Sequence, residues 1–112
     1  MSKEITFDEA YAQASSEAIK ILGTVVSKIV TDYLRSRYSI DITKTANNPT
    51  ALDEALEHAI DGGRTIVERK LLNLLYEKLN LEPFIVKEKS TNLSTFEQKV
   101  NEIRQSYSRE MN

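Results

Sequence analysis

The sequence predicts an all-α fold: a bundle of about four helices, with a long N-terminal helix and a central leucine-rich helix. Two observations favour it. Apolar residues recur at spacings of three and four along most of the 112 residues, as on the buried face of a helix. Capping-box patterns also precede three of these apolar runs. Tyr38–Ile42 alternates apolar and polar residues, which predicts a short extended segment. The length fits one domain over residues 1–112.

The first helix is predicted to begin after Thr6, which forms a capping box with Glu9. Its apolar spacing continues to about Tyr38, and such a helix would be about 48 Å long. A compact chain of this size is only about 35 Å across. Either Gly23 breaks the run into two helices, or one helix overhangs and packs on a partner chain. A long helix bent at Gly23 is favoured, because no turn residues flank this glycine.

The second helix is short and is predicted to end near Ile60. It begins either at Asn48, with Pro49 as its first residue, or at a capping box on Thr50. The turn Asp61–Gly63 follows, in which a glycine is expected to supply the left-handed residue.

The central helix is predicted over Arg64–Leu79. Its apolar stripe is wide enough to contact other elements on two sides. The stripe consists of Val67, Leu71, Leu74, Leu75 and Leu79.

The last helix is predicted to begin near Ser94, in a capping box with Glu97. Its apolar residues form a narrow seam with the four-three-four spacing of a two-helix contact. We take this seam as a candidate interface. Together with the long first helix it predicts a homodimer, the commonest symmetric assembly. The seam consists of Phe96, Val100, Ile103 and Tyr107.

Composition excludes several classes of protein. There is no cysteine, which excludes disulfide scaffolds, thiolate metal sites and cysteine nucleophiles. The net charge of −2 is unlike that of a basic nucleic-acid coat. The start of the chain has no apolar core like that of a signal peptide, and Lys20 and Lys28 interrupt the most apolar stretch, Ile19–Val30. These features predict a cytoplasmic protein without membrane contact.

Two constellations could carry chemistry. Glu54, His58 and Asp61 share one helix face and could hold a metal, but there is no other histidine, and a solvated helix face is the favoured interpretation. We therefore expect no metal and no cofactor. Before the central helix, Gly62, Gly63 and Arg64 are a candidate anion contact, because free amides at a helix start attract anions. A turn with a helix cap is the favoured explanation there, since no phosphate-loop pattern is present.

Catalysis is not predicted. The serines lie in no recognisable nucleophile motif, and only His58 could act as a histidine base. The densest basic-aromatic group is Arg35-Ser36-Arg37-Tyr38, which could hold nucleic acid or simply complement the dipole at a helix end.

Three groups of residues in the chain have a pattern that is similar to a known family. They are Leu22-Gly23 with Val26, Ile29 and Tyr33-Leu34; Ala55-Leu56 with the Gly62-Gly63 turn; and Ile66-Val67-Glu68-Arg69 followed by Leu71-Leu72, Leu74-Leu75-Tyr76 and Lys78-Leu79. Through these groups, residues 15–82 resemble the Nitrosopumilus output domain, a small archaeal helical domain family. The resemblance implies an archaeal, mostly helical domain that occurs alone or at the end of sensor proteins, with no assigned chemistry and no functional residues to carry over.

The function predicted from these features is that of a small helical interaction module, a signalling output domain that acts through protein–protein contacts. The alternative is a small nucleic-acid-binding regulator that uses Arg35, Arg37 and neighbouring lysines. Retention on heparin or DNA that weakens steeply with salt separates the two.

Overall fold

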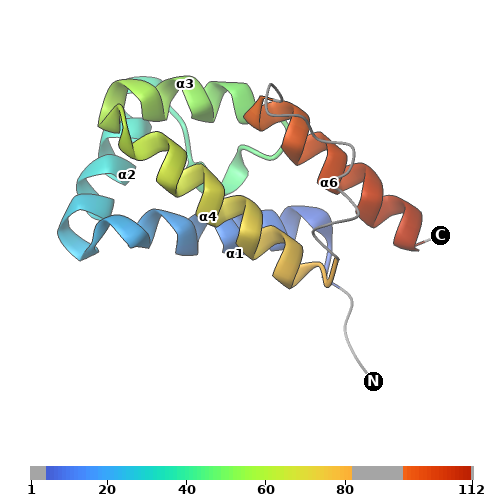
Figure 1. Cartoon of the computed structure of the whole chain (residues 1–112). Helices are drawn as coiled ribbons and strands as arrows, with labels where there is room; N and C mark the ends of the chain where they lie inside the picture. Colours follow the sequence, from blue (N-terminus) through green and yellow to red (C-terminus); the bar gives the residue numbers. More distant parts are fainter. Residues whose placement is uncertain (1–4, 82–94, 112) are drawn as a thin grey trace.

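The computed structural model describes residues 5–81 and 95–111, and within them it confirms an all-α fold. These residues contain no strand. Figure 1 shows α4 crossing α1, with α3 and α6 packed on one side and α2 at the end of the molecule where α1 ends. The helices are α1 (Phe7–Ile19), α2 (Thr24–Tyr38), α3 (Pro49–Ile60), α4 (Gly63–Lys78) and α6 (Phe96–Met111), with 3₁₀ turns η1 (Lys20–Leu22) and η2 (Ile42–Lys44).

The favoured long first helix is wrong, because the chain breaks at Gly23. α1 ends at Ile19, η1 follows, and Gly23 adopts φ 94° and ψ 159°, a conformation that side-chain-bearing residues rarely take. The break lets α1 pack on α4 while α2 packs on α3, so both apolar stripes serve one core. The radius of gyration is 13.9 Å, as expected for a compact chain of this length.

The start of α1 follows the predicted capping box. The backbone N–H of Glu9 donates to Thr6 Oγ1 over 3.1 Å, and the backbone N–H of Thr6 donates to Glu9 Oε1 over 3.0 Å. Small residues then line the buried side of the helix, which permits the close crossing with α4. These residues are Ala10, Ala14, Ser15 and Ala18.

Between α2 and α3 the predicted extended segment is wrong. Ser39 ends α2 in the left-handed conformation, and η2 begins after Asp41, whose Oδ1 accepts from the N–H and the hydroxyl of Thr43 over 3.0 and 2.7 Å. These hydrogen bonds hold the pKa of Asp41 below its ordinary value. Ile42 enters the core from η2. This segment is therefore shaped by the end of α2 and the cap of η2 and not by pairing with a strand.

The structure decides between the two predicted starts of α3 and corrects the prediction for the turn after it. Asn48 caps α3, with Pro49 as the first helical residue, rather than Thr50. At the other end, Asp61 takes the positive φ of 45° that was expected of a glycine, while Gly62 has φ −61°. Gly63 is already the first residue of α4.

The prediction of a central helix is confirmed. α4 contacts α1, α3 and α6, and all five leucine and valine positions of its predicted stripe are buried. At its start, Ile66 lies outside the core and is exposed.

The capping box of the last helix lies one residue later than predicted. The N–H of Gln98 donates to Thr95 Oγ1 over 3.1 Å, and the N–H of Thr95 donates to Gln98 Oε1 over 2.9 Å. Ser94 lies outside the described residues. None of the described helices combines the length and the apolar character needed to cross a membrane.

Candidate functional site

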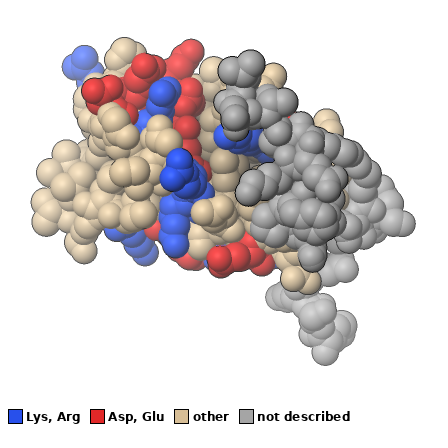
Figure 2. All heavy atoms as spheres, viewed as in Figure 1, with Lys and Arg blue, Asp and Glu red and all other residues tan. Residues whose placement is uncertain are grey.

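The outer side of η1 and of the first half of α2 exposes four large aliphatic side chains, which we call the α2 face. Val25 and Ile29, one helical turn apart, are 70% and 61% exposed. Ile21 and Val26 are 50% and 44% exposed. Figure 2 shows that uncharged side chains dominate the surface at this end of the molecule. Single exposed aliphatic residues are ordinary, but a cluster of them is typical of a binding surface.

The α2 face is exposed because the opposite side of α2 is already committed to the core. That side buries Ser27, Val30 and Leu34, and it contacts α3. Gly23 permits this orientation, since it turns the chain away from the direction of α1. The sequence predicted some of these aliphatic residues as one stripe of a long first helix, so their exposure was missed.

The segment that carries the α2 face has a net positive charge. Residues 20–38 hold four basic side chains and a single acidic one, Asp32. Lys28 Nζ lies 3.9 Å from Asp32 Oδ2, and both side chains are largely exposed, so this pair contributes little to stability. Lys20 lies near Glu17, whose pKa is lowered mainly by the hydrogen bond that Lys78 donates over 2.7 Å.

The candidate anion contact is occupied by the chain's own carboxylates. Arg64 Nη1 lies 3.3 Å from Asp53 Oδ1 and 3.8 Å from Glu57 Oε1. The guanidinium therefore joins α4 to α3. An anion at Gly62 and Gly63 would have to compete with two carboxylates for this arginine.

Next to this ion pair lies a carboxyl group that the sequence analysis missed. Glu68 on α4 is partly buried, and its Oε2 atom is buried without a hydrogen-bond partner among the residues that the structure describes. Burial raises the pKa of Glu68 to about 9, and the hydrogen bond and negative charge of Asp53 add to the increase. Arg64 and Lys99 act in the opposite direction. Glu68 therefore holds a proton at neutral pH, with which it can donate to Asp53.

We expect Glu68→Gln to stabilise the chain at neutral and mildly basic pH. The folded-state pKa is raised, so the proton favours folding below pH 4.5 and this contribution is lost as the pH rises toward about 9. Gln is neutral at every pH and can still donate to Asp53. Allowing for solvent screening of a partly exposed group, the gain at pH 8 is about 1–2 kcal/mol.

Urea unfolding of both proteins between pH 5 and pH 9 measures this difference. The gain in stability of Glu68→Gln should shrink toward pH 5. At that pH Glu68 of the unfolded wild type is already partly protonated, so folding has to take up less of a proton. Equal pH profiles for the two proteins would show that Glu68 is ionised in the fold.

The predicted metal face does not assemble. His58 is exposed and stacks on Tyr38, with ring centroids 6.3 Å apart. Glu54 and Asp61 are exposed as well. In the part of the chain that the structure describes, no three His, Cys, Asp or Glu side chains lie close enough to hold a metal ion.

The candidate interface of α6 lies inside the chain. Phe96, Val100 and Ile103 are buried, and α6 contacts α3 and α4. The hydroxyl of Tyr107 donates to the carbonyl of Ile5. Within the described residues this seam therefore packs on the chain's own core, and Tyr107 is partly buried at its end.

Arg104 also attaches α6 to the rest of the fold. Its guanidinium lies 4.8 Å from the centre of the Phe7 ring, and it donates to the carbonyl of Ala46. α6 thereby contacts both the start of α1 and the segment after η2.

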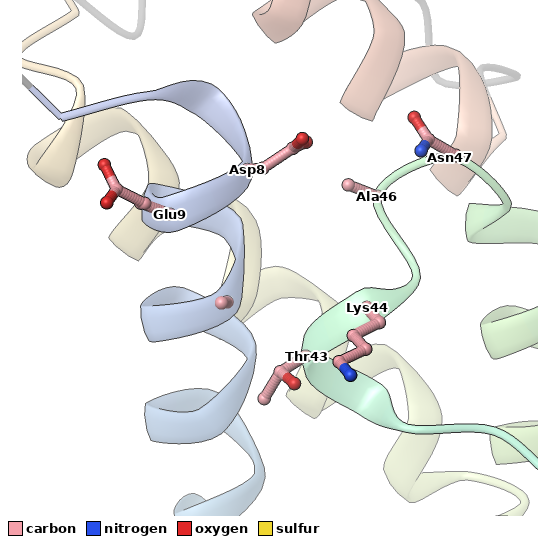
Figure 3. A pocket seen from close by; sticks show the side chains of 7 residues that line it. Asp8, Glu9, Thr43, Lys44, Ala46 and Asn47 are labelled. Atoms are coloured by element: carbon pink, nitrogen blue, oxygen red, sulfur yellow. The ribbon is translucent and has the colours of Figure 1, made fainter.

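A hollow of about 360 Å³ lies between the start of α1 and the segment that contains η2. Figure 3 shows Asp8 extending from α1 toward Ala46 and Asn47, while Glu9 points to the other side of α1, where it caps Thr6. Its described lining contains no histidine, serine or cysteine, and its one hydroxyl group, that of Thr43, donates to Asp41 Oδ1 over 2.7 Å. The lining residues are Asp8, Glu9, Ala12, Thr43, Lys44, Ala46 and Asn47.

Comparisons of this chain with family models, with curated proteins and with solved structures find no match. The resemblance to the Nitrosopumilus output domain therefore stays a prediction.

Proposed function

We propose that this chain is a helical protein-interaction module and that it binds its partner through the α2 face. The observation that carries the proposal is the exposure of Ile21, Val25, Val26 and Ile29 along one side of η1 and α2. Burial of such side chains against a partner removes aliphatic surface from water. Each Å² that is buried contributes about 25 cal/mol of favourable free energy.

The other arrangements on the surface support catalysis less well. The hollow beside Asp8 opens to solvent, and the one hydroxyl group among its described lining residues, that of Thr43, donates to Asp41. Glu68 has a strongly raised pKa, but its neighbours Asp53 and Arg64 form a structural ion pair between two helices. We therefore favour binding over catalysis.

The sequence analysis proposed the α6 seam as the homodimer interface. Because that seam is buried within the chain, a homodimer would have to use another surface. Among the described residues, the α2 face is the largest group of exposed aliphatic side chains. Light scattering at micromolar concentration tests the dimer. The archaeal origin, the signalling role and the cytoplasmic location stay predictions.

We expect Val25→Asp/Ile29→Asp to weaken partner binding strongly while the fold is retained. The experiment selects binders from a displayed library of helical peptides of about 20 residues, a length that can form an isolated helix. Anisotropy of the enriched, labelled peptides then measures affinity for the wild type and the variant. Affinity for the variant should fall at least about tenfold, because two carboxylates would enter an apolar contact.

The matched control is Asn73→Asp/Gln105→Glu. It adds two negative charges at exposed positions of α4 and α6, outside the α2 face. This control should bind the peptides like the wild type, and circular dichroism should show equal helicity for all three proteins. If the enriched peptides bind Val25→Asp/Ile29→Asp as tightly as the wild type, the α2 face is not the binding surface.

A further inference from the structure

We propose that the partner of the α2 face is an amphipathic helix whose apolar stripe is flanked by Asp and Glu side chains. This inference rests on the function proposed above and adds the chemistry of the partner.

The shape of the α2 face suits a helix. Val25 and Ile29 form a ridge one helical turn apart, with Val26 beside it, and such ridges pack into the grooves of another helix. Apart from Gly23 itself and its two neighbours in the chain, no described residue has a heavy atom within 4 Å of the place where Gly23 would carry a Cβ. The break before α2 therefore leaves room for a partner side chain at the end of the ridge.

Charge decides the kind of helix. Residues 20–38 carry a net charge of +3, from Lys20, Lys28, Arg35 and Arg37 against Asp32, although the whole chain has a net charge of −2. Lys20 and Lys28 directly precede Ile21 and Ile29 in the sequence, and Lys28 is exposed beside its ion pair with Asp32. A partner with acidic flanks meets complementary charge around an apolar centre, which favours specific pairing and fast association.

The same charges disfavour two other occupants. A two-fold contact between copies of this chain places the positively charged α2 segments against each other, and like charges oppose such pairing. Nucleic acid would use the lysines and arginines, but its phosphates gain nothing from the four exposed aliphatic side chains at the centre. An acidic amphipathic helix uses both the aliphatic side chains and Lys20 and Lys28, which adjoin Ile21 and Ile29.

The test compares the peptides that the library yields on the wild type and on Lys20→Glu/Lys28→Glu. Peptides enriched on the wild type should carry net negative charge, and those enriched on the reversed protein should carry net positive charge. For a single wild-type peptide, replacing its flanking glutamates by lysines should weaken binding to the wild type about tenfold and restore binding to Lys20→Glu/Lys28→Glu. Wild-type affinity should also fall as salt is raised.

The control for total charge is Lys44→Glu/Asn73→Asp/Gln105→Glu, which changes the net charge by the same amount at exposed positions outside the face. It should leave the preference for acidic peptides unchanged.

Each contrary result has a distinct meaning. Peptides that depend on Val25 and Ile29 but show no acidic preference overturn this inference and leave the proposed function standing. If none of the peptides depends on Val25 and Ile29, both the acidic-helix inference and the proposed function are overturned. A dimer by light scattering that Val25→Asp/Ile29→Asp dissolves identifies a second copy as the occupant. Binding of a DNA duplex that Lys20→Glu/Lys28→Glu abolishes identifies nucleic acid, and either of these two results overturns the acidic helix.

Discussion

Ile103→Asp is expected to unfold the chain rather than to separate a dimer. Ile103 is fully buried on α6, which packs against α3 and α4. An aspartate there loses the apolar contacts of isoleucine and buries a carboxyl group in an apolar environment that offers it no ion pair. The expected cost exceeds about 4 kcal/mol, a large part of the total stability of a small domain.

Circular dichroism and urea unfolding measure this effect, and Gln105→Asp is the control. It places the same side chain on the same helix at an exposed position, so its unfolding midpoint should stay close to that of the wild type. A folded, monomeric Ile103→Asp protein with a wild-type midpoint would instead place the seam at an interface between copies.

The features that sequence predicts well here are local ones. A capping box needs only two side chains three residues apart, and Thr6 and Glu9 form theirs as predicted. The stripe of α4 also follows from the helical repeat alone, because its leucines all point to one side. At Thr95 the same rule holds with the helix start one residue later.

The features that sequence misses depend on contacts between distant segments. Ile103 has the same spacing whether its partner helix belongs to this chain or to another, so the seam alone cannot identify the partner. Gly23 breaks the first helix because separate packing of α1 and α2 completes one core, and no local turn signal marks that break.

The candidate site shows the same limit. The helical repeat of α4 places Glu68 outside the apolar stripe, which predicts an exposed position. Only the packing of α3 beside α4 brings Asp53 next to it. The α2 face is likewise made of residues that belong to an apolar stripe in the sequence. Their exposure follows from the direction that α2 takes after Gly23.

Leu75→Ala is expected to lower the free energy of unfolding by about 2–5 kcal/mol, as for other fully buried leucines. Leu75 has no exposed surface and lies on α4, the helix that contacts α1, α3 and α6. Its truncation leaves a cavity at the centre of the fold, where three neighbouring helices would all have to move to close it.

The control for Leu75→Ala is Leu72→Ala, which makes the identical substitution on the same helix at a half-buried position. It removes less buried surface and opens toward solvent, so we expect a loss of about 1 kcal/mol. Urea unfolding monitored by circular dichroism compares the two variants. Equal losses at both positions would contradict the orientation of α4, because the structure turns Leu75 inward and leaves Leu72 at the edge of the core.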